Sequence, residues 1–332
     1  LNSTKLLFLS VLMVSTLITI SSNSWLGMWM GLEINLMSFI PLISKPKDKK
    51  ASQAMMIYFL TQSIGSVTLL FSVTMNSLIF MSPLMMSELA KTMIMVSILV
   101  KIGAAPFHFW FPEMMANLDW MSCFMLMTWQ KLAPLTVLSN TIPNNWALYT
   151  SVMLSSTVGG FGALNQTSLR KILAYSSISH LSWMMMFMSM NNSWYLYLLI
   201  YSILVSLICL FFYKLNILFI NQLLLISPSM TEKMVFAINM LSIGGLPPFL
   251  GFLPKWMVIQ SMMNSGMFFT LLIMMLTSLM TLFYYMRMIT SIILMYTTTN
   301  KWINYKSPNK SLMLSMLMIN LALPVIMFIE IF

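Results

Sequence analysis

Lys101-Ile-Gly-Ala-Ala-Pro-Phe-His-Phe-Trp-Phe-Pro112 is the stretch that decides the fold of this 332-residue chain. It follows a long apolar run, yet it opens on a lysine and contains one glycine and two prolines. Proline removes a backbone donor and clashes with the preceding turn, so the stretch predicts a helix interrupted beside a buried charge. A second stretch, Ile243-Gly-Gly-Leu-Pro-Pro-Phe-Leu-Gly-Phe-Leu-Pro-Lys255, predicts the same arrangement again.

The composition places both stretches in a membrane. Hydrophobic residues make up 59% of the chain and charged residues 7%, whereas soluble globular proteins carry roughly 25% charged residues. Long apolar runs without alternation favour membrane helices over a barrel. The predicted fold class is therefore an all-α polytopic membrane protein with no soluble domain. We interpret the 40 methionines as flexible apolar filler rather than as a metal or redox site.

The sequence contains no visible cofactor site. Cys123 and Cys209 fall inside predicted helices and lack the spacing of a disulfide framework, a zinc site or an iron–sulfur site. Gly160-Phe-Gly-Ala-Leu-Asn165 is near a dinucleotide-binding loop but lacks its third glycine and its preceding strand. We expect neither a cofactor nor a metal in this chain. The formal charge of +10 is spread among loops, which favours membrane topology over nucleic-acid binding as its cause.

Hydropathy predicts about eleven membrane helices. They lie at about 5–22, 24–43, 54–76, 89–107, 120–141, 146–164, 172–190, 194–214, 234–263, 267–296 and 311–331. The apolar run at residues 1–20 lacks a convincing cleavage site, so we interpret it as the first helix rather than as a signal peptide. The two interrupted helices are five spans apart, which reverses their direction and predicts an inverted repeat around an ion pathway.

The loop charges predict the orientation of the chain. Alternate loops lie on the same side of the membrane. One set of these loops holds no lysine or arginine: the loops around Asn23, 75–88, 142–145, 190–193 and 264–267. The opposite side collects Lys45, Lys47, Lys49, Lys50, Arg170, Lys171, Lys214, Lys233, Lys301, Lys306 and Lys310. Positive loops stay inside, so we expect the amino terminus inside and the carboxyl terminus outside.

Four charges within apolar helices are the main candidate functional residues: Glu33, Lys101, Lys131 and Lys255. Such a charge costs roughly 2.5–3.5 kcal/mol near the bilayer centre, so a partner or water must offset it. Burial disfavours a lysine ammonium, whereas a carboxylate at about 4 Å favours it by roughly 4 kcal/mol at an effective dielectric near 20. A small movement of an acidic partner can therefore load or release a proton. The alternative is structural, with the lysines satisfying free carbonyls and Glu33 packing between helices.

Other ionisable residues are weaker candidates. His180 lies mid-span among hydroxyl residues, where it either carries protons between lysines through water or simply packs. We interpret His108, in the first interrupted segment, as a packing or capping residue. Glu113 and Asp119 lie at the membrane edge, and we interpret them as solvated carboxylates, with proton intake as the alternative.

Five motifs resemble the chain 2 family of mitochondrial NADH–ubiquinone oxidoreductase, in its animal and particularly its insect form. The match runs in order through nearly the whole chain. It departs from the family in two places. Leu1 stands in place of an initiator methionine, and the region after Thr297 matches only in character. The motifs are Trp25-Leu-Gly with Gly31-Leu-Glu-Ile-Asn-Leu36, Lys101-Ile-Gly-Ala-Ala-Pro-Phe-His-Phe-Trp110, Thr128-Trp-Gln-Lys-Leu-Ala-Pro134, Leu164-Asn-Gln-Thr-Ser-Leu-Arg-Lys171 and Gly244-Gly-Leu-Pro-Pro-Phe-Leu-Gly-Phe-Leu-Pro-Lys-Trp256.

The resemblance implies a proton-translocating, antiporter-like core subunit in the membrane arm of respiratory complex I. It implies that Glu33 pairs with Lys101, that Lys131 continues a central hydrophilic axis, and that Lys255 belongs to a second half-channel. We expect one domain over residues 1–332, with half-channels at about 24–141 and 146–296 and a final helix at about 311–331.

The resemblance also implies a location and partners. We expect the mitochondrial inner membrane, with the amino terminus in the matrix and the carboxyl terminus in the intermembrane space. The implied partners are neighbouring antiporter-like subunits and membrane lipids such as cardiolipin. FMN, iron–sulfur clusters and ubiquinone are expected in other subunits. Two alternatives stay open, a stand-alone sodium–proton exchanger that uses the same lysines and a purely structural membrane scaffold.

Overall fold

The computed structural model describes residues 3–45, 48–77, 83–141, 146–190, 193–225, 230–294 and 310–324. These residues form helices and their connections, with one isolated bridge between Ser168 and Phe219, so the all-α prediction is confirmed. Of the predictions above, those on Lys47, Lys301 and Lys306, on the loop at 142–145 and on the last helix beyond residue 324 lie outside the described residues.

Five helices in this described part are long and apolar enough to cross a membrane by length and composition. They are Ser3–Ser21, Trp25–Ile43, Lys49–Met75, Trp194–Leu215 and Phe268–Ile293. The other predicted spans do not meet both the length and the hydropathy condition within the described residues, and two of them are interrupted. The chain divides into two compact units, Leu1–Ser155 and Ser156–Phe332.

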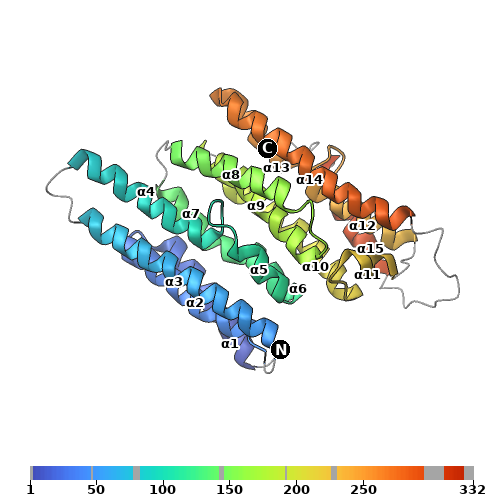
Figure 1. The fold of residues 1–332 in the computed structure, drawn as a ribbon, viewed down its shortest axis with the longest axis horizontal. Coiled ribbons are helices and arrows are strands. Elements are labelled where there is room, and N and C mark those ends of the chain that lie inside the picture. The colour runs from blue at the N-terminus through green and yellow to red at the C-terminus, as the bar shows by residue number, and fades with distance from the viewer. Residues whose placement is uncertain are drawn as a thin grey trace. The chain divides into compact units, whose positions relative to one another are not determined.

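The first unit packs its helices around α7 (Trp129–Thr141), which is largely buried. In chain order its helices are α1 (Ser3–Ser21), α2 (Trp25–Ile43), α3 (Lys49–Ser77), α4 (Pro83–Ile102), α5 (Trp110–Asn117), α6 (Trp120–Met127) and α7 (Trp129–Thr141). The blue helices α1, α2 and α3 lie in sequence beside one another, and α3 also contacts α4 and α5 (Figure 1). Helix α8 (Trp146–Gly162) contains the boundary between the units.

Helix α2 shows how local sequence sets a helix start. The Ser24 hydroxyl accepts a hydrogen bond from the Gly27 amide at 3.2 Å, which satisfies one of the free amides of the first turn. The helix then carries Leu32, Leu36 and Phe39, all buried, along one face toward its neighbours. The same helix also carries Glu33, so its packing fixes where that carboxylate lies.

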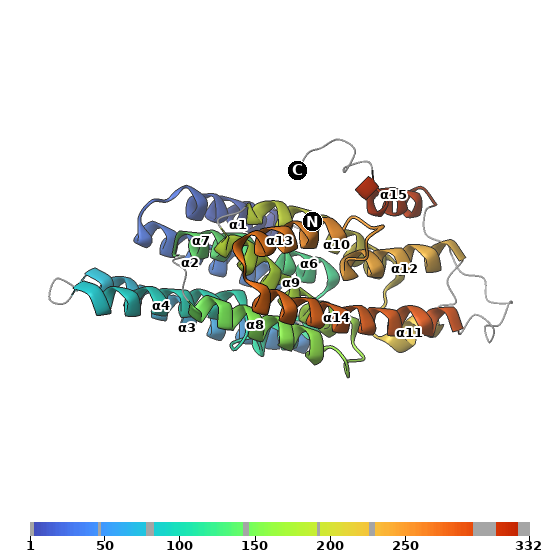
Figure 2. The same cartoon turned by 90° about the horizontal axis from the view of Figure 1, so that it is seen from above.

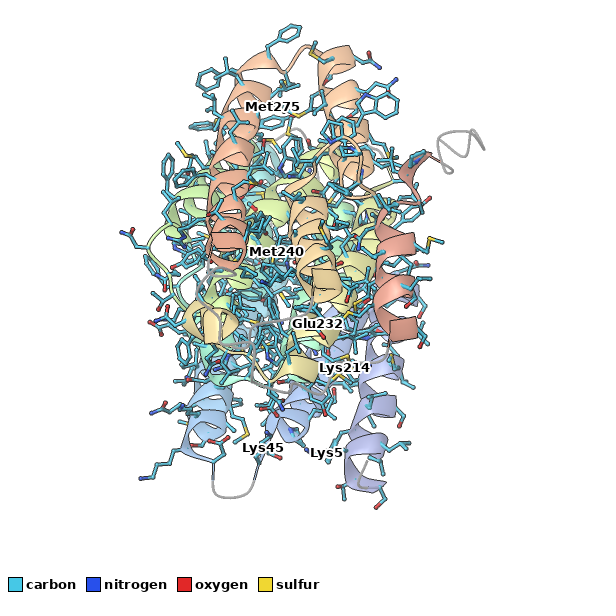
Figure 3. All side chains as sticks on the ribbon, turned by 90° about the vertical axis from the view of Figure 1, so that its right-hand side faces the viewer. Lys5, Lys45, Lys214, Glu232, Met240 and Met275 are labelled. Atoms are coloured by element: carbon cyan, nitrogen blue, oxygen red, sulfur yellow. The ribbon has the colours of Figure 1, made fainter. Side chains whose placement is uncertain are left out.

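The second unit is built around α9. Its other helices are α10 (Trp194–Leu215), α11 (Ile220–Leu225), α12 (Met230–Gly244), α13 (Phe252–Ser265), α14 (Phe268–Leu294) and α15 (Lys310–Asn320). Helix α9 (Leu169–Ser189) is buried on all sides from Ser176 onward and contacts α10, α13 and α14 (Figure 2). In contrast, α14 exposes apolar side chains such as Met275, whereas Met240 of α12 is buried (Figure 3). Exposed apolar side chains on long helices fit a lipid environment.

Most predicted helix ends agree with the structure within a few residues, and two spans differ from their predicted bounds. The helix predicted at 89–107 ends at Ile102, because Gly103 adopts a left-handed conformation there. The helix predicted as continuous over 120–141 is interrupted at Thr128, which separates α6 from α7. The Thr128 hydroxyl bonds the Phe124 carbonyl at 2.7 Å, and such back-bonding bends helices.

Candidate functional site

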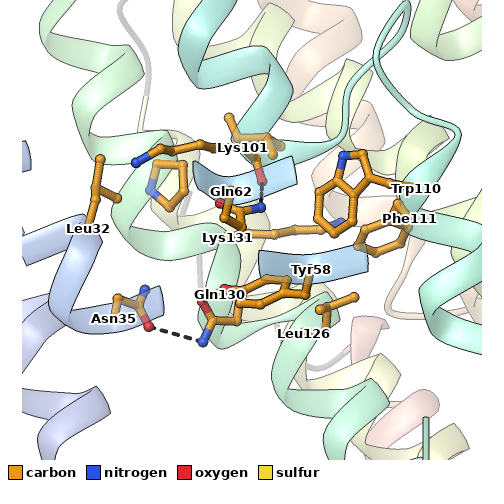
Figure 4. Close-up of a pocket in the computed structure, with 12 residues that line it drawn as sticks. Leu32, Asn35, Tyr58, Gln62, Lys101, Trp110, Phe111, Leu126, Gln130 and Lys131 are labelled. Atoms are coloured by element: carbon orange, nitrogen blue, oxygen red, sulfur yellow. Dashed lines mark hydrogen bonds between the residues drawn. The ribbon is translucent and has the colours of Figure 1, made fainter. Parts of the chain in front are cut away.

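The first interrupted helix ends in a compact turn, and three of its last carbonyls are hydrogen-bonded. Gly103 has φ 77°, and the Ala104 amide bonds the Leu99 carbonyl at 3.1 Å, as in a Schellman helix end. The Lys101 carbonyl accepts a hydrogen bond from Gln62 Nε2 at 2.9 Å (Figure 4). The indole of Trp110 donates to the Val100 carbonyl at 3.2 Å. Neutral side chains therefore satisfy two of the carbonyls that the interruption frees, those of Val100 and Lys101.

The ammonium of Lys101 faces Glu33. Lys101 is 5% exposed, and its Nζ lies 4.0 Å from Glu33 Oε1, which is buried and makes no hydrogen bond. At 4.0 Å the two groups interact through charge rather than through a hydrogen bond. The aliphatic stem of Lys101 runs over Gly65 of α3, where an added Cβ would lie 2.7 Å from Lys101 Cγ. The absence of a side chain at residue 65 thus makes room for the lysine.

Lys131 lies just after the interruption at Thr128. Its amide bonds the Thr128 carbonyl at 3.3 Å, in the tighter i to i+3 pattern of a helix start. The side chain is 2% exposed, and its Nζ lies 5.6 Å from the centre of the Phe111 ring. An aromatic face attracts a cation at this distance. Sequence reasoning placed Lys131 in the middle of an intact helix, but the structure places it at a helix start.

Lys101 and Lys131 line the same small cavity. The cavity measures about 20 Å³, and a water molecule needs roughly 10–15 Å³ on this measure, so one water fits. Its polar lining includes a hydrogen-bonded chain from Tyr58 to Gln130 at 3.2 Å and from Gln130 to Asn35 at 3.0 Å (Figure 4). The cavity therefore gives two buried lysines a common polar space.

The second interrupted helix ends in the same turn but uses its lysine differently. Gly245 has φ 79°, and the Leu246 amide bonds the Leu241 carbonyl at 3.3 Å. Lys255, on α13 and 7% exposed, donates from Nζ to the Gly244 carbonyl at 2.7 Å. A Cβ on Gly245 would lie 2.8 Å from Lys255 Cδ. Lys255 thus caps the helix that precedes the interruption.

Helix α15 also holds the second interruption. The Asn320 carbonyl accepts from the Leu250 amide at 3.0 Å, and the Asn320 side chain donates to Asn239 Oδ1 of α12 at 2.5 Å. Both asparagines are buried. The C-terminal region that matched its relatives only in character therefore supplies specific contacts to the interrupted segment.

His180 lies in the centre of the second unit. It is 6% exposed, and its Nδ1 lies 2.9 Å from the Tyr197 hydroxyl, while the Tyr201 ring centre lies 4.9 Å from its own. Helix α9, which carries His180, contacts α13, which carries Lys255. The polar surroundings of His180 agree with a residue that exchanges protons, and they also satisfy a packing histidine.

The weaker candidates lie at the ends of helices. His108 packs on Phe109 at 4.2 Å between ring centres, and its Nδ1 lies 3.3 Å from the Pro106 carbonyl. Asp119 forms an exposed ion pair with Lys45, and Lys45 lies with Lys5 at one end of the first unit (Figure 3). Such exposed pairs contribute about 0–1 kcal/mol. Among the described residues, no group of three histidine, cysteine or acidic side chains could hold a metal ion.

Sequence reasoning missed the neutral polar residues of the first site. Gln62, Tyr58 and Asn35 line the cavity beside the two lysines, yet none of them was a candidate. A usable signal existed for Gln62, which stands three residues before Gly65 within a predicted membrane helix. Residues at this spacing share a helix face. Neutral polar residues on membrane helices therefore indicate a polar site as charged residues do.

Interrupted helices with buried lysines, in a chain of apolar helices, are features of membrane proteins that move ions, since ion sites form where helices are discontinuous. The family model described as NADH:quinone oxidoreductase/Mrp antiporter, TM, matches residues 22–281. NADH-ubiquinone oxidoreductase chain 2 of Locusta migratoria is 44% identical over 93% of this chain and 91% of its own. The same protein of Anopheles gambiae is 47% identical over 80% and 79%. The chain therefore belongs to the NADH:quinone oxidoreductase/Mrp antiporter family, in its NADH-ubiquinone oxidoreductase chain 2 branch.

Solved structures share the fold. A chain of respiratory complex I from Thermus thermophilus with bound aureothin has a TM-score of 0.80 at 22% identity, covering 94% of this chain and 75% of that one. A chain of the Mrp complex from Dietzia has a TM-score of 0.75 at 14% identity, covering 92% and 61%. These likenesses confirm an antiporter-like membrane fold.

Proposed function

We propose that this chain is a core membrane-arm subunit of proton-pumping NADH:ubiquinone oxidoreductase, and that it relays protons through Glu33, Lys101, Lys131, His180 and Lys255. The observation that carries the relay is the cavity shared by Lys101 and Lys131, with Glu33 4.0 Å from Lys101. Movement of Glu33 away from Lys101 disfavours its ammonium form. The released proton can then pass toward Lys131 through the polar cavity that both side chains line.

The chain performs this step without redox chemistry of its own. In this proposal FMN, the iron–sulfur clusters and ubiquinone belong to other subunits, and their electron transfer drives the movement of Glu33. The first half-channel covers about residues 24–141 and the second about 146–296, as one inverted repeat within a single domain. The role of Lys255 in the second half-channel is supported by its burial beside an interrupted helix.

Replacing Lys131 with methionine in the whole complex tests the relay. Methionine keeps the apolar stem but removes the exchangeable proton, so we expect the ratio of protons pumped to NADH oxidised to fall by at least about a third. The measurement is proton uptake by vesicles that contain the purified complex. Lys50→Met, at an exposed position of α3, is the matched control and is expected to leave the ratio unchanged. A Lys131→Met complex that assembles and pumps normally would contradict the relay.

The likeness to a chain of the Mrp complex favours one second candidate, a stand-alone cation–proton exchanger. Such an exchanger would be active when this chain alone is reconstituted in vesicles with a sodium gradient. The relay predicts no exchange from the isolated chain, because the driving electron transfer is absent.

We propose the mitochondrial inner membrane as the location, with the amino terminus in the matrix and the carboxyl terminus in the intermembrane space. The partners in this proposal are neighbouring antiporter-like subunits and lipids such as cardiolipin. A largely apolar cavity of about 410 Å³, lined by Lys5 and Lys45 among other residues, supports a lipid at the amino-terminal end of the first unit. Isolation of the native assembly, followed by mass spectrometry of its proteins and lipids, tests these assignments. An assembly without antiporter-like neighbours would contradict them.

A further inference from the structure

Two adjacent tyrosines of α14 stand out in the second unit because both are buried with hydroxyls that lack a hydrogen bond. Tyr284 and Tyr285 are 0% and 1% exposed, and their ring centres lie 4.6 Å apart. Neither hydroxyl oxygen has a partner in hydrogen-bonding geometry. A buried polar group without a partner is costly, so its retention calls for an explanation.

Helix α9 presents hydroxyl oxygens to both tyrosines. Ser176 and Ser179 lie one turn apart on α9, and Ser176 shares a helix face with His180. Each serine donates its own proton to a backbone carbonyl one turn earlier, Ser176 to Leu173 at 2.9 Å and Ser179 to Ser176 at 2.7 Å. Their oxygens therefore remain acceptors. Tyr285 lies near Ser176 and Tyr284 lies near Ser179, although neither pair meets hydrogen-bond geometry.

One end of this group of hydroxyls reaches His180. Tyr201 of α10 interacts with Tyr285 on one side, and its ring centre lies 4.9 Å from that of His180 on the other. Tyr197, one turn earlier on α10, has its hydroxyl 2.9 Å from His180 Nδ1. All of these side chains are buried. The buried hydroxyl-bearing side chains of α14, α9 and α10 thus form one group that includes a direct hydroxyl contact to the histidine.

The other end reaches the residue that Lys255 contacts. Lys255 Nζ donates to the Gly244 carbonyl at 2.7 Å. A Cβ on Gly244 would lie 3.5 Å from Cδ2 of Tyr285, so the Tyr285 ring packs directly on this glycine. The Tyr285 ring therefore lies beside the helix end that Lys255 caps.

We propose that Tyr284 and Tyr285 are proton-conducting residues that connect Lys255 with His180. This inference rests on the proposed function, in which Lys255 and His180 exchange protons. In each transfer a tyrosine hydroxyl accepts one proton on its lone pair and donates its own proton onward, so the phenol ends neutral. The proton that leaves the Lys255 ammonium arrives on the His180 imidazole, and no oxidant or reductant takes part. Ser176, Ser179 and Tyr201 supply the intermediate oxygens.

The test replaces both tyrosines with phenylalanine in the whole complex, as Tyr284→Phe with Tyr285→Phe and as each single change. Phenylalanine keeps the ring packing and removes only the hydroxyls. We expect normal NADH oxidation with an uncoupler present, and a fall of at least about a third in protons pumped per NADH. Tyr195→Phe, at an exposed position of α10, is the matched control and is expected to leave pumping unchanged.

A packing role predicts the opposite outcome. Removal of two buried hydroxyls without partners would leave pumping normal and would leave thermal stability equal or higher, and this result would overturn the proposal. Should the double variant not assemble, the two single variants decide, since each is expected to slow pumping. Lys255→Met distinguishes failure of the tyrosine connection from failure of the relay through Lys255. If that variant stops pumping while the tyrosine variants pump normally, the tyrosine connection fails and the relay stands. If all of them pump normally, the relay through Lys255 fails as well.

Discussion

The two interrupted helices share one backbone design but place their charges on opposite sides of it. Lys101–Glu113 and Ile243–Lys255 align without a gap, with glycine at the third position and proline at the sixth and twelfth. In both segments the third residue is left-handed and a new helix starts at the tenth, Trp110 in one and Phe252 in the other. The charges differ, since the first segment has its buried lysine before the turn and the second has it after.

This difference decides what each lysine does. In the first segment Gln62 and Trp110 satisfy the free carbonyls, so the Lys101 ammonium faces the carboxylate of Glu33. In the second segment Lys255 itself satisfies the Gly244 carbonyl. The structural alternative for buried lysines therefore applies to Lys255 in addition to its proposed relay role. Lys101 has a charged partner on another helix, which suits a switch.

The largest expected effect is a difference in thermal stability between the Lys255→Met and Lys101→Met complexes. Lys255→Met leaves the buried Gly244 carbonyl without a donor, which costs about 1–3 kcal/mol. Lys101→Met leaves the carbonyl caps intact, and the Glu33 side chain is 25% exposed. We expect the Lys255→Met complex to unfold at a lower temperature than the Lys101→Met complex, as measured by thermal unfolding of the purified assemblies. Equal midpoints would show that the capping contact contributes nothing.

The glycines that contact the two lysine side chains, Gly65 at Lys101 and Gly245 at Lys255, provide the second test. Gly245→Ala places a side chain at φ 79°, which costs about 1–2 kcal/mol, and sets its Cβ 2.8 Å from Lys255 Cδ. Gly65→Ala has a similar clash with Lys101, but alanine gains about 1 kcal/mol in a helix. We expect Gly245→Ala to lower the yield of assembled complex, and Gly65→Ala to preserve assembly while it slows pumping. Native gel electrophoresis and proton uptake measure the two outcomes, and the reverse order would refute the comparison.

The smallest expected effect concerns the neutral cap. Gln62→Leu removes the donor to the Lys101 carbonyl and should lower stability by about 1 kcal/mol. Gln53→Leu, at an exposed position of the same helix, is the matched control. The thermal midpoint of the assembled complex is the measurement. If the two variants unfold at the same temperature, Gln62 does not act as a cap. The first interrupted helix would then not differ from the second by having a neutral side-chain cap.

Much of the fold was predictable because its signals are local. Gly103 with Pro106, and Gly245 with Pro247, end helices through backbone geometry alone, so the two main interruptions were predicted correctly. The interruption at Thr128 was missed, because Met127-Thr-Trp-Gln-Lys131 contains neither glycine nor proline. Pro134 follows within α7 but its effect on the preceding turn depends on packing.

The sequence by itself determined that this chain is a membrane protein with buried charges at interrupted helices. Composition, hydropathy and backbone chemistry act over a few residues, so they are legible without any tertiary contact. Only the tertiary structure decided the partner of each charge. Whether a lysine meets the carboxylate of Glu33 or the carbonyl of Gly244 depends on distances between helices that are far apart in the chain. The tyrosine pair of α14 became a candidate for the same reason, since its neighbours come from α9, α10 and α12.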